Sequence, residues 1–315
     1  MTKGKLRIGT RESQLATWQA TQVKDLLGQH GIASELVLIK SEGDIDLVTP
    51  LYEIGVQGVF TRSLDAALLS NKIDLAVHSL KDVPTQPASG ISQAAVLKRG
   101  PANDLLVFKD EGTQAVYLSN EDVRKRRPFH IATSSIRRKA QWLNKYPDDI
   151  IHNLRGNVNT RLSKLQSESR DAAIFAQAGL ERIGLRPMPS MILDWMLPAP
   201  AQGAIVVVCR SGDRKAIAVC MELNDGETEM CTRIEREFLR RLSGGCSTPI
   251  SALACVRDDS IYFRGNILSL DGHDKIEIEK SMPLSDVGDL GKSAAEELLE
   301  KGGEAILNNL RHASE

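Results

Sequence analysis

One cysteine stands in a setting that suits covalent chemistry. Cys246 follows Gly244 and Gly245 in the stretch LSGGCSTP at 242–249, directly after a helical pattern rich in Glu and Arg. Paired glycines reach backbone angles closed to other residues and let a ligand come close. A thiol on such a tight loop is suited to be an attachment point. The alternative is a buried structural cysteine, because free Cys packs as a small hydrophobe.

Several arginines fall where expected strands pass into helices. Such junctions combine the amide groups of a helix N-terminus with a guanidinium fork, and together these suit carboxylates. A single arginine is more often a solvated surface charge, but a polycarboxylate ligand would account for the whole set. Its members are Arg11, Arg137, Arg138, Arg155, Arg161 and Arg182.

A charged pair, Lys81 and Asp82, follows an expected buried strand at 74–77 and precedes Pro84. Open α/β sheets bind ligands at this edge. A carboxylate that faces arginines stays ionised at neutral pH and could stabilise a cation that forms in a substrate. The alternative for Asp82 is an ordinary turn residue. Gln19, one turn into the first helix, reaches the same edge or faces solvent.

The elements that would position these residues alternate between strand and helix. The first unit begins with a strand at 6–10, a helix capped by Ser13, a strand at 35–40, a long loop at 41–59 and a helix at 61–69. The second has strands at 131–133, 150–154 and 171–175, with Ser134 and Ser135 opening a helix after the first of them.

A change of character after residue 211 predicts a smaller α+β domain, with strands at 250–256, 261–268 and 275–282 and a final helix. An apolar strand at 204–209 is expected to return to the first sheet. The chain therefore divides into a first α/β domain at 1–101 with a return segment at 203–222, a second at 102–202, and a C-terminal domain at 223–315.

Composition narrows the class of partner. The 315 residues carry 40 basic and 41 acidic side chains, and 4% are aromatic, so a small molecule is favoured over nucleic acid. The five cysteines form no CxxC pair or cysteine–histidine cluster, which predicts neither disulfides nor a metal site. No apolar signal segment or membrane-spanning run is found, and we expect a soluble cytoplasmic protein without membrane contact.

Six segments together resemble the porphobilinogen deaminase (hydroxymethylbilane synthase) family, in the same order and over nearly the whole chain. They are LRIGTRES at 6–13, AVHSLKDVP at 76–84, TSSIRR at 133–138, LRGNVNTR at 154–161, AQGA at 201–204 and GGC at 244–246. The resemblance implies two α/β domains like those of periplasmic binding proteins with a cleft between them, plus a smaller C-terminal α+β domain that carries the cofactor cysteine.

The resemblance also implies an activity. The enzyme would be a cytoplasmic, monomeric transferase of heme and tetrapyrrole biosynthesis without a nucleic-acid or membrane partner. It would deaminate its substrate, porphobilinogen, and join four molecules of it head to tail on a dipyrromethane cofactor. Cys246 would hold that cofactor by a thioether, Asp82 would be catalytic, and hydrolysis would release hydroxymethylbilane.

 The residues implied to bind the cofactor are Ser13, Ser79, Lys81, Asp82, Thr133, Ser134, Ser135, Arg137, Arg138, Arg155 and Gly156. Those implied to bind substrate are Arg11, Gln19, Arg155, Arg161 and Arg182.

One departure from the family and two other functions are weighed against this assignment. Bacterial members are expected to carry lysines where this chain has Glu53 and Gln57, and Lys40 or Arg62 could compensate. A non-catalytic two-lobed binding protein for a polycarboxylate would leave Cys246 without a task. A nucleic-acid binder using the basic stretches at 125–127 and 137–139 is disfavoured by the balanced charge and scarce aromatics.

Overall fold

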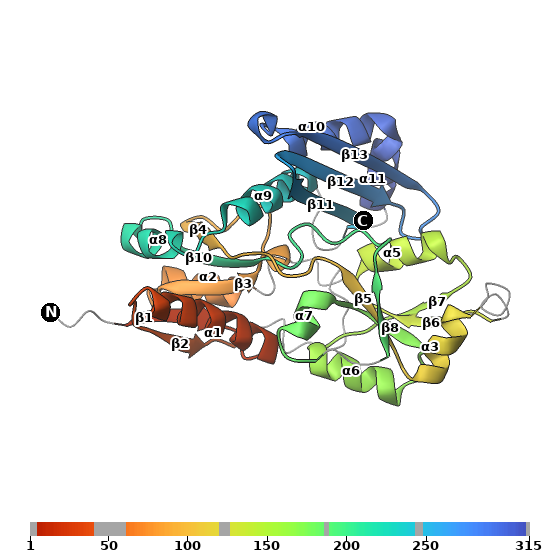
Figure 1. The fold of residues 1–315 in the computed structure, drawn as a ribbon, viewed down its shortest axis with the longest axis horizontal. Helices are drawn as coiled ribbons and strands as arrows, with labels where there is room; N and C mark the ends of the chain where they lie inside the picture. Colours follow the sequence, from red (N-terminus) through yellow and green to blue (C-terminus); the bar gives the residue numbers. More distant parts are fainter. Residues whose placement is uncertain (1–4, 41–60, 120–126, 186–188, 243–247, 313–315) are drawn as a thin grey trace.

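The computed structural model describes residues 5–40, 61–119, 127–185, 189–242 and 248–312. Within them the chain forms two five-stranded sheets and one three-stranded sheet (Figure 1). Cys246, Glu53 and Gln57 lie outside the described residues, so their predicted roles stay predictions. No helix of the described part is long and apolar enough to cross a membrane.

The first sheet has the strand order β2-β1-β3-β10-β4. Its strands are β1 (Leu6–Thr10), β2 (Ser34–Leu38), β3 (Leu75–Ser79), β4 (Ile91–Val96) and β10 (Ile205–Arg210). β1 runs parallel to β2 and β3, whereas β10 runs antiparallel to β3 and β4. The carboxyl ends of β1 and β3 therefore meet at one edge, where Arg11 and Asp82 follow them.

Helices cover both faces of this sheet: α1 (Gln14–Gln29), α2 (Arg62–Leu69) and α8 (Arg214–Met221). Because successive side chains of a strand point to opposite faces, β3 supplies Leu75 and Val77 to the core beneath α1 and α8. Ala76 of the same strand packs with Leu64 and Leu68 of α2. The apolar run of β3 is thus explained by burial on both sides.

The second sheet has the order β7-β6-β8-β5-β9. Its strands are β5 (Asp104–Phe108), β6 (His130–Ala132), β7 (Ile150–His152), β8 (Ala172–Ala176) and β9 (Ser190–Leu193), and its helices are α3 (Glu111–Leu118), α5 (Ile136–Lys145), α6 (Val158–Ser167) and α7 (Gln177–Glu181). The side chain of Ser135 caps α5 and that of Asn157 caps α6, each accepting from a backbone N–H of the first turn.

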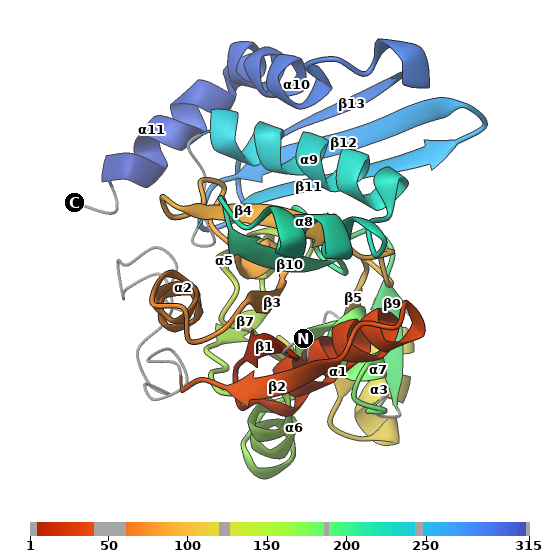
Figure 2. The same ribbon diagram turned by 90° about the vertical axis from the view of Figure 1, so that its left-hand side faces the viewer.

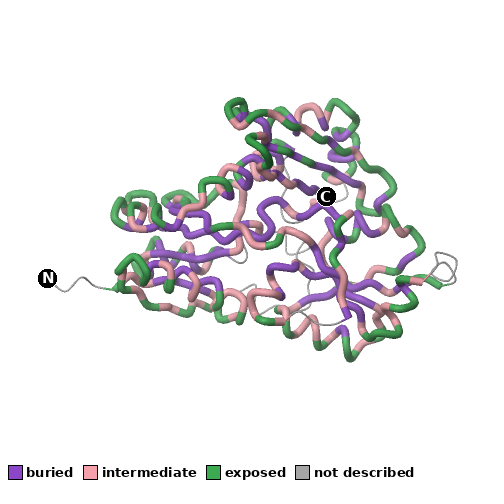
Figure 3. Tube along the Cα trace, viewed as in Figure 1, coloured by how far each residue is buried: buried purple, intermediate pink, exposed green. Residues whose placement is uncertain are grey.

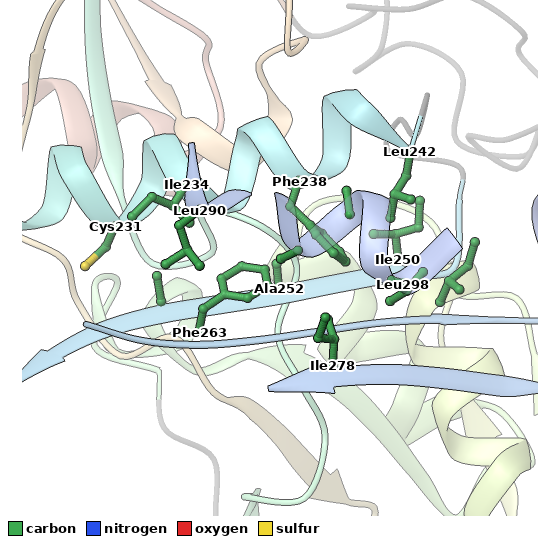
Figure 4. Packing of buried hydrophobic residues seen from close by; sticks show 14 of the residues in the cluster. Cys231, Ile234, Phe238, Leu242, Ile250, Ala252, Phe263, Ile278, Leu290 and Leu298 are labelled. Atoms are coloured by element: carbon green, nitrogen blue, oxygen red, sulfur yellow. The ribbon is translucent and has the colours of Figure 1, made fainter. Parts of the chain in front are cut away.

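The C-terminal unit packs helices against an antiparallel sheet of β11 (Ile250–Arg257), β12 (Ser260–Leu268) and β13 (Lys275–Pro283). Its helices are α9 (Gly226–Arg241), α10 (Leu290–Leu298) and α11 (Glu304–His312), with short turns η3 (Leu284–Asp286) and η4 (Leu299–Gly303). The rings of Phe238 and Phe263 meet edge to face at 5.1 Å in its core (Figure 4). α9 lies between this sheet and β4 (Figure 2).

In each of the three units the strands are mostly buried (purple), and the outward-facing turns of the helices are exposed (green) (Figure 3). The expected fold class, two α/β domains and a smaller C-terminal α+β domain, is confirmed. The strand expected at 204–209 lies in the first sheet as β10. The bounds of the three domains stay a prediction.

Candidate functional site

A cleft of about 610 Å³ runs between the first two units. It is lined from one side by the ends of β1 and β3 and from the other by the N-terminal ends of α5 and α6 and by α7. Most of the predicted site residues meet there. They are Arg11, Ser13, Gln19, Ser79, Lys81, Asp82, Ser134, Ser135, Arg137, Arg138, Arg155, Gly156, Arg161 and Arg182.

Among the predicted site residues that the structure describes, Thr133 is the one that the cleft lining does not include. It is buried, and its Oγ1 accepts a hydrogen bond of 3.2 Å from the backbone N–H of Ser135. This hydrogen bond therefore helps to fix the backbone of Ser135, the N-cap of α5. Lys40 lines the cleft, and Arg62 is not among its lining residues.

Asp82 ends a single 3-10 turn, η2 (Leu80–Asp82), that follows β3 directly. Leu80 is buried beneath this turn, and its N–H donates to the carbonyl of Ala204 at 3.0 Å. Arg236 of α9 donates to the carbonyls of Leu80 at 3.2 Å, Val83 at 2.9 Å and Pro84 at 2.7 Å. The backbone that carries Asp82 is therefore held by the C-terminal unit as well as by its own sheet.

Lys81 points its ammonium group at a neutral amide. Its Nζ donates to Oε1 of Gln202 at 3.1 Å. Burial lowers the pKa of Lys81 to about 8, while the carboxylates of Asp82 and Asp104 act in the opposite direction. Lys81 remains mostly a cation at neutral pH, in surroundings that favour an added negative charge.

Arg137 and Arg138 have an internal carboxylate partner. Both pair with Asp104 at the start of β5, each at 2.7 Å, and all three side chains are buried. Although burial alone would raise the pKa of Asp104, the two guanidinium groups hold it well below its usual range. Further N–H groups of the arginines donate to the carbonyls of Leu197 and Ile174. The sequence predicted ligand contacts for these two arginines, and it gave no sign of this internal pairing.

Arg155 lies two residues before Asn157, the N-cap of α6, and Arg161 lies at the end of the first turn of this helix. Nε of Arg161 donates to the carbonyl of Gly156 at 2.7 Å, which fixes its direction. Burial lowers the pKa of Arg161 to about 10, with Arg138 and Arg155 acting in the same direction and Asp82 against it. Arg161 thus remains charged at neutral pH although it is partly removed from water. A bound polyanion would relieve that cost.

The wall formed by the first unit carries neutral polar side chains beside its charged ones. Gln19 is buried, and its Nε2 donates to Oγ of Ser79 at 2.8 Å, so the alternative of a solvent-facing Gln19 is wrong. Ser13 accepts from the N–H of Ala16 as the cap of α1. Burial, assisted by Arg11, lowers the pKa of His78 to about 4, so this cleft residue is neutral at pH 7.

Two contacts join the walls across the cleft. Arg182 of the second unit lies 5.8 Å from the ring centre of Trp18 on α1 and donates to the carbonyl of Gly203 at 2.5 Å. Asn159 of α6 donates to Oε1 of Gln14 on α1 at 2.9 Å. Arg182, predicted as a substrate ligand, therefore also connects the two walls.

Three residues of the site were not singled out from the sequence: Asp104, Gln202 and Arg236. Gln202 lies in the AQGA segment, one of the segments that carry the family resemblance, and this was the sequence feature that could have pointed to it. Asp104 opens an apolar strand, DLLVF, where a charged residue predicts a buried partner. Arg236 lies on a helix rich in charged residues and carried no distinguishing mark.

The chain around Cys246 is anchored on both sides. Leu242 and Ile250 are both buried in the core of the C-terminal unit. The N–H of Ala252 donates to the carbonyl of Pro198 at 3.2 Å, and the next residue along, Ala199, lines the cleft. No group of three or more His, Cys, Asp or Glu that could hold a metal occurs in the described ranges.

Comparison with known proteins agrees with this arrangement. A family model described as "Porphobilinogen deaminase, dipyromethane cofactor binding domain" matches residues 6–218, and the "Porphobilinogen deaminase, C-terminal domain" model matches residues 229–300. The porphobilinogen deaminase of Trichlorobacter lovleyi is 39% identical over 314 residues, which cover 98% of this chain and 98% of the relative. That of Pelobacter propionicus is 38% identical over 314 residues with the same coverage.

Among solved structures, an ancestral cationic amino acid solute binding protein is similar with a TM-score of 0.44 at 14% identity, over 70% of this chain and 89% of that chain. The family assignment rests on the sequence relatives and the two family models. Since these models match most of the chain and the relatives match nearly all of it, the chain belongs to the porphobilinogen deaminase family.

Proposed function

We propose that this transferase of tetrapyrrole biosynthesis deaminates four porphobilinogen molecules and joins them head to tail on a dipyrromethane cofactor held by Cys246. Hydrolysis then releases hydroxymethylbilane. The observation that carries the proposal is a cleft in which Asp82 shares one space with Lys81, Arg155 and Arg161. The pyrrole units of this cofactor and substrate bear acetate and propionate groups, for which such a cleft offers cations.

The residues present fit the cofactor. Guanidinium groups bind carboxylates through paired hydrogen bonds, and helix N-termini add further N–H donors. Arg155, Gly156 and Arg161 combine both features at α6, while Ser135 marks the N-terminus of α5. A cleft of about 610 Å³ is in the usual range for a ligand of moderate size.

The described residues supply electrostatic stabilisation. When ammonia leaves the aminomethyl group of porphobilinogen, positive charge develops on the methylene carbon and the pyrrole nitrogen. Asp82 is the carboxylate of the cleft that would lie beside this charge, and a preorganised group of this kind is commonly the largest catalytic contribution. The bound cofactor supplies the pyrrole carbon that accepts the new unit.

Preorganisation has a structural basis here. The turn that bears Asp82 is fixed by three hydrogen bonds from Arg236 and by the buried side chain of Leu80. The carboxylate therefore does not need to be reorganised when the charge forms. Lys81 would hold a carboxylate of the cofactor and Arg161 one of the substrate, so that each new unit is bound in the same cleft as Asp82.

The mass of the intact protein tests the attachment. Freshly purified active protein is expected to be heavier than its sequence by two linked pyrrole units, and Cys246→Ser is expected to remove the excess. Cys255→Ser is the matched control, because Cys255 is a half-buried free cysteine on β11. It should retain the added mass. An unmodified mass in active protein would refute the attachment at Cys246.

A further inference from the structure

Gln202 occupies the segment in which the chain returns from the second sheet to β10. It is 1% exposed, yet it contributes to the lining of the cleft. Its Nε2 donates to the carbonyl of Ala102 at 2.7 Å and to Oδ1 of Asp104 at 2.9 Å. Its Oε1 accepts from Nζ of Lys81 at 3.1 Å. One neutral side chain thus connects Lys81 of the first unit with Asp104 of the second.

The orientation of this amide is fixed by its partners. An ammonium group is purely a donor, whereas a carbonyl and an ionised carboxylate are purely acceptors. Rotating the amide by half a turn would place N–H groups against Lys81 and its oxygen against Ala102 and Asp104. Each contact would then be repulsive, so the side chain has a single satisfied arrangement.

We propose that Gln202 is a positioning residue, which aims the ammonium group of Lys81 into the cleft and ties it to the Asp104 cluster. The inference rests on the proposed function in treating Lys81 as a ligand for substrate or cofactor carboxylates. A neutral acceptor holds the ammonium group in place without neutralising it. The positive charge therefore remains available for an incoming carboxylate.

The surrounding charges explain why glutamine suits this position better than glutamate. Asp82 lies next to Lys81 in the chain, and Asp104, Arg137 and Arg138 face it from the second unit. A carboxylate at position 202 would compete with the ligand for Lys81. It would also stand within hydrogen-bond distance of Asp104, where like charges are unfavourable.

The test compares Gln202→Met and Gln202→Glu in the full-length, cofactor-loaded protein. Lys81 is labelled by acetic anhydride over a range of pH, and its acetylation is followed by peptide mass spectrometry. Methionine removes an acceptor that favours the charged amine, so the pH midpoint of labelling should fall. Glutamate adds a negative charge, so the midpoint should rise. Both variants should lose roughly tenfold in kcat/KM, equivalent to about 1.4 kcal/mol.

Gln141→Met is the matched control. Gln141 is also a buried amide that joins two units, with Nε2 donating to the carbonyl of Leu197 at 2.9 Å and to Oγ of Ser251 at 3.0 Å. It does not bond to Lys81. This variant should lower the melting temperature and leave both the labelling midpoint and kcat/KM unchanged.

Two outcomes would overturn the inference. Labelling midpoints that stay at the wild-type value in both Gln202 variants would show that Gln202 does not act on Lys81. Midpoints that move in one direction in all three variants would indicate a general loss of packing. Both outcomes are read from the labelling of Lys81, so they are obtained whether or not the wild-type protein makes hydroxymethylbilane. Failure of the proposed function is recognised separately, by the absence of hydroxymethylbilane among the products.

Discussion

The residues around Asp82 determine how its carboxylate can interact with a bound molecule. The carboxylate is placed on a short turn anchored by the buried Leu80, and cationic side chains of α5 and α6 line the opposite wall of the cleft. A carboxylate that is partly removed from water interacts more strongly with a nearby positive charge. The residue type is ordinary, and the position makes it suited to catalysis.

Asp82→Asn should therefore retain the fold and lose most turnover, because an amide cannot neutralise the developing cation. A loss of about 10² to 10³ in kcat is expected for a preorganised group of this kind. Steady-state rates are to be measured on variant protein whose mass shows a loaded cofactor. Turnover close to wild type in that sample would rule out the role assigned to Asp82.

Asp104 differs from Asp82 because its arginine partners are bound to it inside the protein. It is fully buried and balances two guanidinium groups that have little access to water. Removing one member of such a group leaves a buried charge without compensation, which is costlier than losing an exposed pair. Substitutions at Arg137 should consequently affect stability as well as ligand binding.

Asp104→Asn should lower the free energy of unfolding by about 3 to 5 kcal/mol. Glu296→Gln is a suitable control, because Glu296 pairs with Arg241 at 3.1 Å with both side chains largely exposed. That control should change stability by less than about 1 kcal/mol. Urea unfolding compares the two, and equal small effects would contradict a supporting role for the Asp104 cluster.

At the level of elements, α9 does more than cover the C-terminal sheet. Glu235 and Arg236 are consecutive, and they reach two different parts of the first two units. The helix packs on β11 with one side and approaches β4 with the other. Its position is therefore coupled to the turn that carries Asp82.

Arg236→Met should lower kcat by roughly 10- to 100-fold, because small displacements of a catalytic group are costly. Arg233→Met is the control on the same helix, since Arg233 makes an exposed pair with Glu237 and does not bond to that turn. Kinetics and thermal unfolding of both variants are compared. If Arg236→Met melts much earlier and keeps its kcat, Arg236 stabilises the fold rather than the active turn.

The elements most open to prediction were those with a clear local pattern. The three strands of the C-terminal sheet begin and end within one residue of the predicted ranges, because alternation and turn residues mark them. The strands β5 and β9 were not individually predicted. β5 is a short apolar run and β9 is an edge strand, and antiparallel pairing with distant segments defines both.

The same distinction applies to the site. Motifs at strand ends located Asp82 and the arginines, since strand order places such ends along one edge. The partners of these residues were not predictable in this way. Lys81 and Gln202 are 121 residues apart, and Arg236 is 156 residues from Leu80. Such contacts depend on how the three units pack together.

In the whole molecule, Glu235 is a point at which the three units meet. It is fully buried and accepts from Arg99 at 2.6 and 3.0 Å, from the N–H of Ala201 at 2.6 Å and from the N–H of Ala254 at 2.8 Å. Arg99 and Ala201 lie in the two segments that connect the first and second units. Ala254 belongs to β11.

Glu235→Gln should lower the free energy of unfolding by about 3 to 5 kcal/mol, because Arg99 would lose its buried counter-charge. Asn159→Ala removes an exposed hydrogen bond between the cleft walls and should change stability by less than about 0.5 kcal/mol. Chemical denaturation of both variants gives the comparison. Similar values for the two would show that the crossing segments are not the stronger connection.

The contacts that hold the first two units together therefore differ in burial between the cleft walls and the crossing segments. The cleft walls touch through the exposed hydrogen bond between Asn159 and Gln14 and through the contact of Arg182 with the ring of Trp18. At the two crossing segments, by contrast, the buried Glu235 accepts hydrogen bonds from Arg99 and from Ala201. Under the proposed function, a lengthening pyrrole chain that pushed the walls apart would break the exposed contacts between them before it disturbed the buried contacts of Glu235. The turn that carries Asp82 is bonded to Arg236, the residue next to Glu235, and would keep its place while the walls separate.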